Sequence, residues 1–381
     1  MHRALDGTGA DVSIRRSVLL ATLALLAAII AAGCGVDLDG PQGGLDAGPR
    51  PPARPGAYVW VCGGPDLIVG SADGGATWQV RNRRPDGDIM TGDLWAIAFG
   101  DVGHGWAVRR GIANPTAAVL ATADAGESWS WQKPGTKGGR LLAVAATDAA
   151  HVWAVGYQRP RGTGDQDRGL VLASSDGGAT WTRQRLPVGL MPFRVAFADA
   201  RHGWLLAGNM DHSSGYHVLA TSDGGAHWRV SYSTQLKLTG LDAVGAKDCW
   251  VVGGVDHPRS GVVIRTSDGG RRWQVHTDVS SEHLLDISFP DDRRGWAVGL
   301  AGTVVTTSDG GATWSAQDPG GEYTLRQVRF SDSQHGWASI ALQALLATTD
   351  GGQSWSVIRP TDEGEVITGL TTVDSDSVAG Q

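Results

Sequence analysis

Seven aspartates stand at the same place in a repeated eight-residue sequence, Ser/Thr-x-Asp-x-Gly-x-x-Trp, and carboxylates can act in pairs as general acid and base. We call each copy an Asp box, and the seven aspartates are Asp73, Asp124, Asp176, Asp223, Asp268, Asp309 and Asp350. Successive boxes start 41 to 52 residues apart, which places one carboxylate in each of seven repeats. A catalytic pair needs carboxyl groups within about 10 Å. Asp side chains instead accept backbone N–H bonds in turns where Gly supplies positive φ. We predict structural aspartates and no catalytic residue.

Four histidines share a position two residues before a tryptophan and could be considered as metal ligands: His104, His151, His202 and His335. One histidine per repeat spreads them apart, so we predict turn or capping groups rather than a metal site. The segment 164–169 holds Asp165 and Asp167. Two carboxylates fall short of the six to eight oxygens that calcium takes. We predict no metal and no cofactor.

Seven arginines lie where the chain departs from the repeat: Arg83, Arg84, Arg109, Arg110, Arg159, Arg161 and Arg168. Guanidinium groups bind carboxylates and phosphates through two parallel hydrogen bonds. The arginines are candidates for binding a carboxylate-rich or phosphate-bearing partner. The alternative is solvated charge on long loops, and the sequence leaves both interpretations open.

The elements that position these residues follow from the repeat. A second series, of Gly-Trp-Ala-Val-Gly type, runs in phase with the boxes and contains Trp60, Trp106, Trp153, Trp204, Trp250, Trp296 and Trp337. Short apolar runs rich in Val, Ile, Thr and Trp, broken by Gly and Asp, predict strands. Four such runs form one repeat, and we label them strands A to D, with the Asp box on the C–D turn. The periodic tryptophans are predicted to be core rather than a sugar-stacking platform.

Repeats of this length are typical of β-propellers and solenoids. The first repeat lacks strand A, because a Pro/Gly-rich stretch leads directly into a B-type run at Tyr58. The C-terminal segment 366–373 matches strand A of the fifth repeat, 238–244. We therefore predict an all-β, seven-bladed propeller over 58–381, with four antiparallel strands per blade. Segment 366–373 completes blade one, which removes two exposed sheet edges.

Long insertions fall between strands B and C of blades two to five. In a propeller the B–C and D–A connections lie on one face, which we call the loop face, and the boxes lie on the other, the Asp-box face. Extra length and the seven arginines therefore gather on one sector of the loop face. Loops on a rigid scaffold are where binding residues usually lie.

The N-terminus predicts export. Arg15 and Arg16 precede an uncharged apolar run at 17–32, which ends at Gly33 and Cys34. Sixteen apolar positions are short for a membrane span, and the pattern is similar to a bacterial lipoprotein signal, with Cys34 as the lipidated residue. We predict a signal peptide at 1–33, a Gly/Pro-rich tether at 34–57 and a lipid anchor in a bacterial membrane, on the periplasmic or cell-surface side.

Charge and cysteine content narrow the possible partners. The net charge of −7 argues against a nucleic-acid partner. Apart from Cys34, only Cys62 and Cys249 are present, in different blades and at different strand offsets, which predicts two buried thiols rather than a disulfide.

The composite pattern His-Gly-Trp-Ala-Val-Gly, then Val-Leu-Ala-Thr-Ser-Asp-Gly-Gly-x-Thr-Trp, resembles the photosystem II stability/assembly-factor propellers of cyanobacteria and plastids, which belong to the Asp-box (bacterial neuraminidase repeat) group. The resemblance covers 58–381 and recurs in every blade. It implies a non-enzymatic propeller that binds a newly made protein at a membrane. We therefore expect a monomeric extracytoplasmic binding or assembly scaffold, which recognises another envelope protein through the loop face.

Glycan binding and glycoside hydrolysis are the two alternative functions. Glycan binding would need exposed aromatics outside the repeat, and only Trp95, Trp131, Tyr157, Tyr216 and Tyr323 are available. Asp boxes also occur in sialidases and xyloglucan-cleaving propellers, which makes a glycoside hydrolase the third possibility. The chain has no Arg-Ile-Pro motif, and its Glu322-Tyr323 pair is equally typical of a turn.

Overall fold

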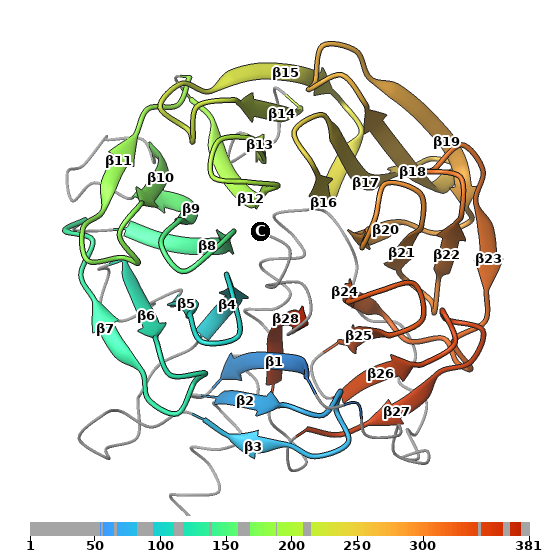
Figure 1. Cartoon of the computed structure of the whole chain (residues 1–381). Helices are drawn as coiled ribbons and strands as arrows, with labels where there is room; N and C mark the ends of the chain where they lie inside the picture. The colour runs from blue at the N-terminus through green and yellow to red at the C-terminus, as the bar shows by residue number, and fades with distance from the viewer. Residues whose placement is uncertain are drawn as a thin grey trace, which may run out of the picture. The chain divides into compact units, whose positions relative to one another are not determined.

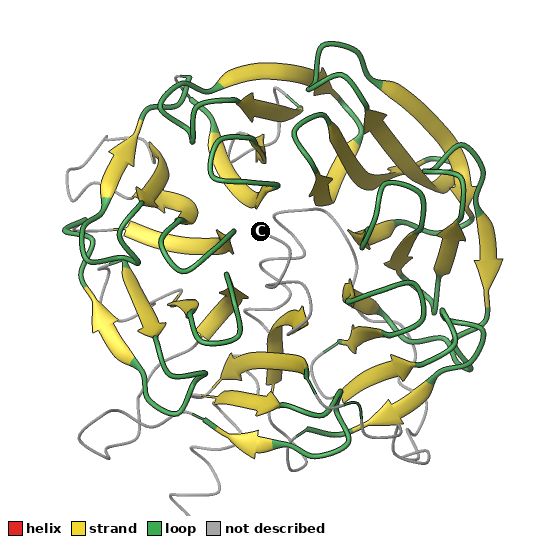
Figure 2. Cartoon of the chain, viewed as in Figure 1, coloured by secondary structure: helices red, strands yellow, loops and turns green. Residues whose placement is uncertain are grey.

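The computed structural model describes residues 54, 56–64, 67–81, 94–109, 117–136, 139–158, 168–187, 189–208, 215–341, 344–360 and 366–374. All of them belong to one compact unit, Pro41–Gln381. The predicted signal peptide, Cys34 and nearly all of the tether lie outside the described residues, so these predictions stay predictions. The described residues form strands, turns and loops, and include no helix that could cross a membrane (Figure 2).

Seven four-stranded antiparallel sheets are arranged around a central axis, which confirms the predicted seven-bladed propeller (Figure 1). From the inside outwards, blade 1 contains β28 (Val366–Asp374), β1 (Ala57–Gly64), β2 (Leu67–Ser71) and β3 (Gln79–Val80). In the same order, blade 2 contains β4 (Leu94–Phe99), β5 (Gly105–Arg109), β6 (Ala118–Thr122) and β7 (Ser130–Gln132). Blade 3 contains β8 (Gly139–Ala146), β9 (Val152–Gln158), β10 (Arg168–Ser174) and β11 (Thr182–Gln184). Blade 4 contains β12 (Met191–Phe197), β13 (Gly203–Gly208), β14 (Tyr216–Thr221) and β15 (Arg229–Thr234), and blade 5 contains β16 (Lys237–Val244), β17 (Asp248–Asp256), β18 (Arg259–Thr266) and β19 (Gln274–Ser280). Blade 6 contains β20 (Leu284–Ser288), β21 (Gly295–Gly299), β22 (Val304–Thr307) and β23 (Ser315–Gln317), and blade 7 contains β24 (Leu325–Phe330), β25 (Gly336–Ile340), β26 (Ala344–Thr348) and β27 (Ser356–Ile358).

The ring closes through the C-terminal strand, as predicted. Strand β28 pairs antiparallel with β1 and supplies the inner strand of blade 1. Arg54 reinforces this closure, because its Nη2 lies 2.8 Å from carboxylate oxygens of both Asp332 in blade 7 and Asp374 at the end of β28. One side chain thus joins the first, last and closing parts of the propeller.

The B-strand tryptophans are core residues, which confirms the prediction for that series, whereas five of the seven box tryptophans are half-buried. The seven B-strand tryptophans are at most 3% exposed. In four blades a strand-A phenylalanine stacks on the B-strand Trp of the preceding blade, as Phe289 does on Trp250 with ring centroids 3.9 Å apart. The same phenylalanine meets the box Trp of its own blade edge-on, as Phe289 does with Trp314. The blades are therefore joined through layers of aromatic rings.

The Gly of the Gly-Trp motif follows from this packing. Phe289 precedes Gly295, and a Cβ on this glycine would lie 2.2 Å from the Phe289 ring. The same clash would arise at the equivalent glycines of blades 2, 4 and 7. Blade 3 has no phenylalanine at this place and pairs Ala146 with Val152 instead. The strand-A phenylalanine and the glycine before the B-strand Trp therefore occur in the same blades.

The thiol prediction is confirmed for Cys62 and Cys249, which are free and buried. Burial raises the pKa of Cys62 to about 12 and raises that of Cys249 well above its ordinary value. Neither thiol is activated as a nucleophile.

The insertion that we expected between strands B and C of blade 5 forms part of a β-hairpin rather than a loop. We predicted an inserted B–C loop over 255–261 in blade 5, but β17 continues to Asp256 and β18 begins at Arg259. The extra residues lengthen a hairpin with His257 and Pro258 at its tip. Alternating cross-strand pairing can continue past the blade edge wherever backbone donors and acceptors remain available.

Candidate functional site

The Asp boxes are self-contained turns. In blade 7, Asp350 Oδ1 accepts hydrogen bonds from Thr348 Oγ1 at 2.8 Å and from Ser354 N at 2.9 Å, while Oδ2 accepts from Ser354 Oγ at 2.6 Å. Thr348 Oγ1 also accepts from Gly352 N. The other boxes repeat the Oδ1 bonds, and most repeat the bond at Oδ2. These carboxylates are occupied by the turns that they stabilise.

The hydrogen bonds favour the ionised form of the box aspartates. The Thr180 hydroxyl, followed by the Thr180 backbone N–H, lowers the pKa of Asp176 to about 2. The His227 backbone N–H and side chain lower that of Asp223 to about 2. A carboxylate held ionised in this way makes a poor general acid or base near neutral pH.

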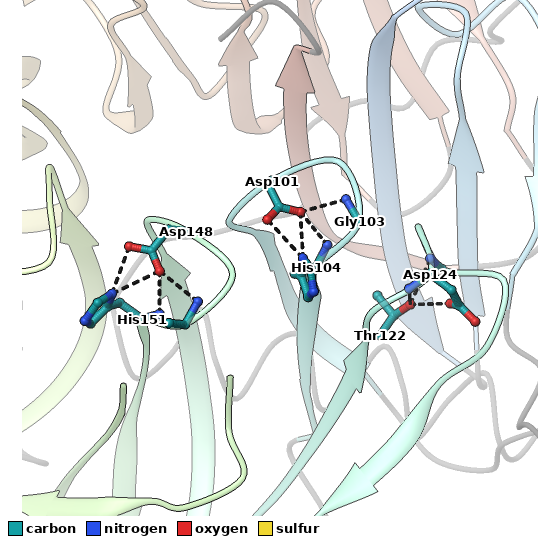
Figure 3. Close-up of polar contacts among 9 residues, drawn as sticks. Asp101, Gly103, His104, Thr122, Asp124, Asp148 and His151 are labelled. Carbon is teal, nitrogen blue, oxygen red and sulfur yellow. Dashed lines mark hydrogen bonds and ion pairs between the residues drawn. The ribbon is translucent and has the colours of Figure 1, made fainter. Parts of the chain in front are cut away.

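The four histidines cap the A–B turns, as Figure 3 shows for His104 and His151. His104 Nδ1 lies 2.9 Å from Asp101 Oδ1, which also accepts from the backbone N–H groups of Gly103 and His104. His151 bonds Asp148 in the same way, as do the pairs His202–Asp199 and His335–Asp332. We predicted the histidines in turns but missed the aspartate three residues earlier, which was the available signal. The described residues contain no group of three His, Cys, Asp or Glu side chains that could hold a metal.

Six of the seven boxes, those of blades 2 to 7, are tied to the A–B turn of their own blade by a backbone hydrogen bond. Gly177 N donates to Ala150 O at 2.9 Å in blade 3, and the equivalent bond recurs in blades 2 and 4 to 7. On the other side, B–C and D–A connections meet, as Gly302 N donates to Tyr323 O at 2.6 Å. The structure therefore has the predicted loop face and Asp-box face. The Tyr323 bond also places Glu322-Tyr323 in a connecting turn.

Only two of the seven candidate arginines lie in the described residues. Arg109 ends β5, and its guanidinium lies 5.9 Å from the centroid of the Trp131 ring. Arg168 is exposed and opens β10, so it belongs to a strand rather than to the loop in which we expected it. Both stand at B–C hairpins, on neighbouring blades. The other candidates, Arg83, Arg84, Arg110, Arg159 and Arg161, lie outside the described residues.

A second group of arginines, on the inner strands, was not among the sequence predictions. Arg194 on β12 of blade 4 and Arg326 on β24 of blade 7 are close enough for the Arg194 charge to act on Arg326. Burial and then that charge lower the pKa of Arg326. Blades 4 and 7 are not neighbours, so this charge acts across the central channel. We call Arg194 and Arg326 the axial arginine pair.

A β-bulge determines where these side chains lie. Every inner strand slips by one residue against its B strand, and the bulged residues are Trp95, Leu142, Phe193, Thr239, Leu285, Arg326 and Thr368. A bulge re-aims the local side chains. Because strand A starts at the loop face, Arg326 and the neighbouring position Arg194 lie towards the loop-face end of the channel.

The channel has its own balance of charge further along strand A. Asp286 Oδ2 accepts from Arg329 Nη1 at 2.7 Å and from Val328 N at 3.1 Å. Asp242 Oδ2 accepts from Phe289 N at 2.7 Å, and burial, opposed by the charge of Arg329, raises the pKa of Asp242 to about 6. These acids satisfy backbone N–H groups on the free edge of the next inner strand. The axial arginine pair, by contrast, has no carboxylate partner among the described residues.

The aromatics available for a glycan platform are largely covered. Tyr216 is buried, and Trp95, Trp131, Tyr157 and Tyr323 are half-buried. Trp131 packs beside Arg109, and Tyr157 beside Arg140. No flat row of exposed rings is present in the described part of the loop face.

Comparison with known proteins places this geometry among known propellers. The family model described as "Photosynthesis system II assembly factor YCF48" matches residues 173–281 and 272–363, which together span half of the chain. No curated protein matches the chain.

Several solved propellers are similar in fold. The structure "YCF48 bound to D1 peptide" has a TM-score of 0.53 at 19% identity and covers 72% of this chain and 82% of its own. The structure of YCF48 from Cyanidioschyzon merolae has a TM-score of 0.52 at 20% identity, with 70% and 84% covered. A chain of the nidogen/laminin complex has a TM-score of 0.51 at 9% identity, with 84% and 99% covered. At these identities the likeness concerns the fold.

Proposed function

Because the chain belongs to the photosynthesis system II assembly factor YCF48 family, we propose that it is a non-enzymatic scaffold, which binds a segment of another protein at its loop face. The observation that carries the proposal is the axial arginine pair. Arg194 and Arg326 are two like charges held near each other, without a carboxylate partner among the described residues. Like charges in proximity are unfavourable unless an anion relieves them.

The surroundings favour a peptide carboxylate as that anion. The channel mouth lies on the face that also carries Arg109 and Arg168 at the hairpins of blades 2 and 3. Guanidinium groups recognise carboxylates through paired hydrogen bonds. An acidic or C-terminal protein segment could therefore reach the axial pair while its flanking residues contact the hairpins.

A relative supports the class of ligand. The solved structure "YCF48 bound to D1 peptide" is a propeller of this family that holds a peptide. We extend peptide binding to this chain and not the identity of the peptide. The partner that we propose is another envelope protein, since the N-terminal pattern predicts export and lipid attachment at Cys34.

The test compares two double variants of the full chain, Arg194→Ala/Arg326→Ala at the channel mouth and Arg293→Ala/Arg294→Ala on the Asp-box face. Both remove two positive charges, so a general charge effect would act on both. Each is used to recover partners from envelope extracts, with recovery measured by quantitative mass spectrometry. We expect one protein to be recovered about tenfold less by the channel variant, since hydrogen bonds between charged groups have been lost.

The far-UV and near-UV circular dichroism of both variants must match the unsubstituted chain. The recovered protein is then tested as synthetic acidic and C-terminal peptides by calorimetry. Equal recovery by both variants would remove the axial arginine pair from the proposal. Cleavage of chromogenic glycosides by the purified chain would contradict the non-enzymatic assignment.

A further inference from the structure

A pocket of about 630 Å³ lies on the Asp-box face at the junction of blades 4 and 5, whose sheets are at the top and upper right of Figure 1. Its lining comes from the box and A–B turn of each of these blades. Trp204 and Trp228 contribute apolar surface, and Lys247, Arg229 and Arg271 contribute positive charge. We call it the junction pocket. Neither the family comparison nor the loop-face proposal accounts for it.

The junction pocket coincides with a break in a hydrogen-bond pattern of the ring. In blades 2, 3, 5, 6 and 7 the B-strand Trp Nε1 donates to a box glycine carbonyl of the next blade, as Trp153 does to Gly224 at 2.9 Å. The corresponding carbonyl for Trp204 is Gly269 O, which instead accepts from Arg229 Nη2 at 2.6 Å. Trp204 is 1% exposed, and its Nε1, like that of Trp60 in blade 1, has no hydrogen-bond partner among the described residues. A buried N–H group in this condition costs free energy, which a ligand acceptor could recover.

The junction pocket also lacks the aromatic layer found at four other junctions. Trp153 and Trp250 each stack on a phenylalanine of the next blade, with centroids 3.5 and 3.9 Å apart. At the place that phenylalanine would occupy in blade 5 the chain has Ala243, paired with Cys249. Trp204 therefore lacks both the stacked phenylalanine ring and the hydrogen bond to a glycine carbonyl that Trp153 and Trp250 have.

Positive charge is concentrated where the box sequence departs from its pattern. Five boxes carry Thr or Ser immediately before the Trp, whereas blade 4 has His227 and blade 5 has Arg272. Arg271 takes the place that Ala179 holds in blade 3, and Lys247 the place that Ala150 holds. The side chains of Lys247 and Arg271 are exposed and have no hydrogen-bond or ion-pair partner within the described ranges.

The two acids of the junction pocket are already engaged. Asp223 accepts from Thr221, from His227 N and from His227 Nδ1. Asp268 Oδ1 accepts from Thr266 Oγ1 and from the backbone N–H groups of the two residues before Trp273. The groups left to meet a ligand are therefore the side chains of Lys247 and Arg271 and the remaining N–H groups of Arg229, whose Nη1 and Nη2 also donate to Gly270 O and Gly269 O.

We propose that the junction pocket binds a phosphate-bearing ligand, whose phosphate meets Lys247, Arg271 and Arg229 while its apolar part lies against Trp228. The donors belong to three different segments, an A–B turn, a box and strand β15. Three donor groups on separate segments can each meet a different oxygen of a phosphate, whereas a carboxylate offers only two oxygens.

The phosphate could belong to a soluble phosphorylated molecule or to a phospholipid headgroup. Two assays of the full chain separate them. Calorimetry with inorganic phosphate and with glucose 6-phosphate, against glucose as blank, measures soluble ligands in a low-salt buffer without phosphate. Flotation with vesicles of phosphatidylglycerol, against phosphatidylcholine, measures headgroups.

The test variant is Lys247→Ala/Arg271→Ala, because these side chains make no hydrogen bond or ion pair in the part of the chain that the structure describes. The matched control is Arg293→Ala/Arg294→Ala, two exposed arginines on the A–B turn of the next blade. We expect the test variant to bind the soluble phosphates about tenfold more weakly, or to lose its preference for phosphatidylglycerol, and the control to change less than about twofold. Loss in the calorimeter assigns a soluble ligand, and loss only in flotation assigns a headgroup.

Two results would overturn the proposal. One is the absence of saturable binding to either phosphate and to phosphatidylglycerol by the unsubstituted chain. The other is an equal loss in both variants, which would indicate diffuse attraction to the Asp-box face rather than a pocket. The thermal midpoint of each variant is measured to show that folding is unchanged.

Discussion

At the scale of single residues, donors within one turn decide the state of the box carboxylates. Asp350 meets three donors, all within six residues of sequence. The A–B aspartates follow the same rule, with a histidine ring as the additional partner. Residues that look catalytic by type are therefore turn-stabilising by contact.

Acid should destabilise the propeller through these carboxylates. An aspartate whose pKa is lower in the folded than in the unfolded chain stabilises the fold at pH values above its unfolded pKa of about 4. That stability is lost as the pH falls through the folded pKa, which is about 2 for Asp176 and Asp223. Urea unfolding between pH 7 and pH 2 should show midpoints that fall steeply below about pH 4. Between pH 7 and pH 4 the midpoints should rise, because the pKa of Asp242 is raised to about 6 in the fold and its protonation there stabilises the folded chain.

Asp350→Asn provides the internal control. The amide resembles the protonated carboxyl, so the variant should be less stable than the unsubstituted chain at pH 7 by about 1–2 kcal/mol. The difference should shrink as the pH approaches 2. A difference that stays constant with pH would assign the effect to shape rather than to ionisation.

At the scale of elements, the blades are joined by matched pairs of residues on strands A and B. Phe289 fills the space above Gly295 and stacks on Trp250 of the previous blade. Blade 3 solves the same problem with Ala146 and Val152. Both pairs of side chains fill the same space between strands A and B, because a large side chain on one strand requires a small one opposite it.

Exchanging these pairs tests the rule. Gly295→Val alone should destabilise the fold by about 3 kcal/mol, because its Cβ would meet the Phe289 ring. Phe289→Ala alone should cost about 3–5 kcal/mol. The double variant, which copies the blade 3 pair, should be more stable than the sum of the single effects by about 1 kcal/mol or more. Urea unfolding of all four chains completes the double-mutant cycle, and simple additivity would show that the two sites do not compete for space.

At the scale of the whole molecule, closure depends on residues from both ends of the unit. Strand β28 contributes the inner edge of blade 1, and its Thr368 Oγ1 donates to Cys62 O in β1 and to Leu94 O in blade 2. Without it, β1 would present an unpaired edge next to two opened blade interfaces.

Removing residues 366–381 should therefore abolish cooperative unfolding and promote association through the exposed edges. A chain that ends at residue 374 is the control and should keep the original transition, because the ladder with β1 ends there. Size-exclusion chromatography and near-UV circular dichroism give the readout. Adding a synthetic peptide of residues 366–374 should restore part of the native signal, and a native-like monomer without β28 would contradict the closing role.

The sequence by itself determined the number of blades, the strand order, the closing strand and the structural nature of the boxes and histidines. These features depend on local turn chemistry and on apolar periodicity, which adjacent residues specify. Only the tertiary structure showed that the charge of Arg194 acts on Arg326 and that Trp204 Nε1 is left without a hydrogen-bond partner among the described residues. The first interaction acts between blades 4 and 7 across the axis, and at the second site Gly269 O accepts from Arg229 of the neighbouring blade. Interactions between blades join residues that are 40 to 132 positions apart in the chain. The sequence repeat does not specify which of these distant residues interact.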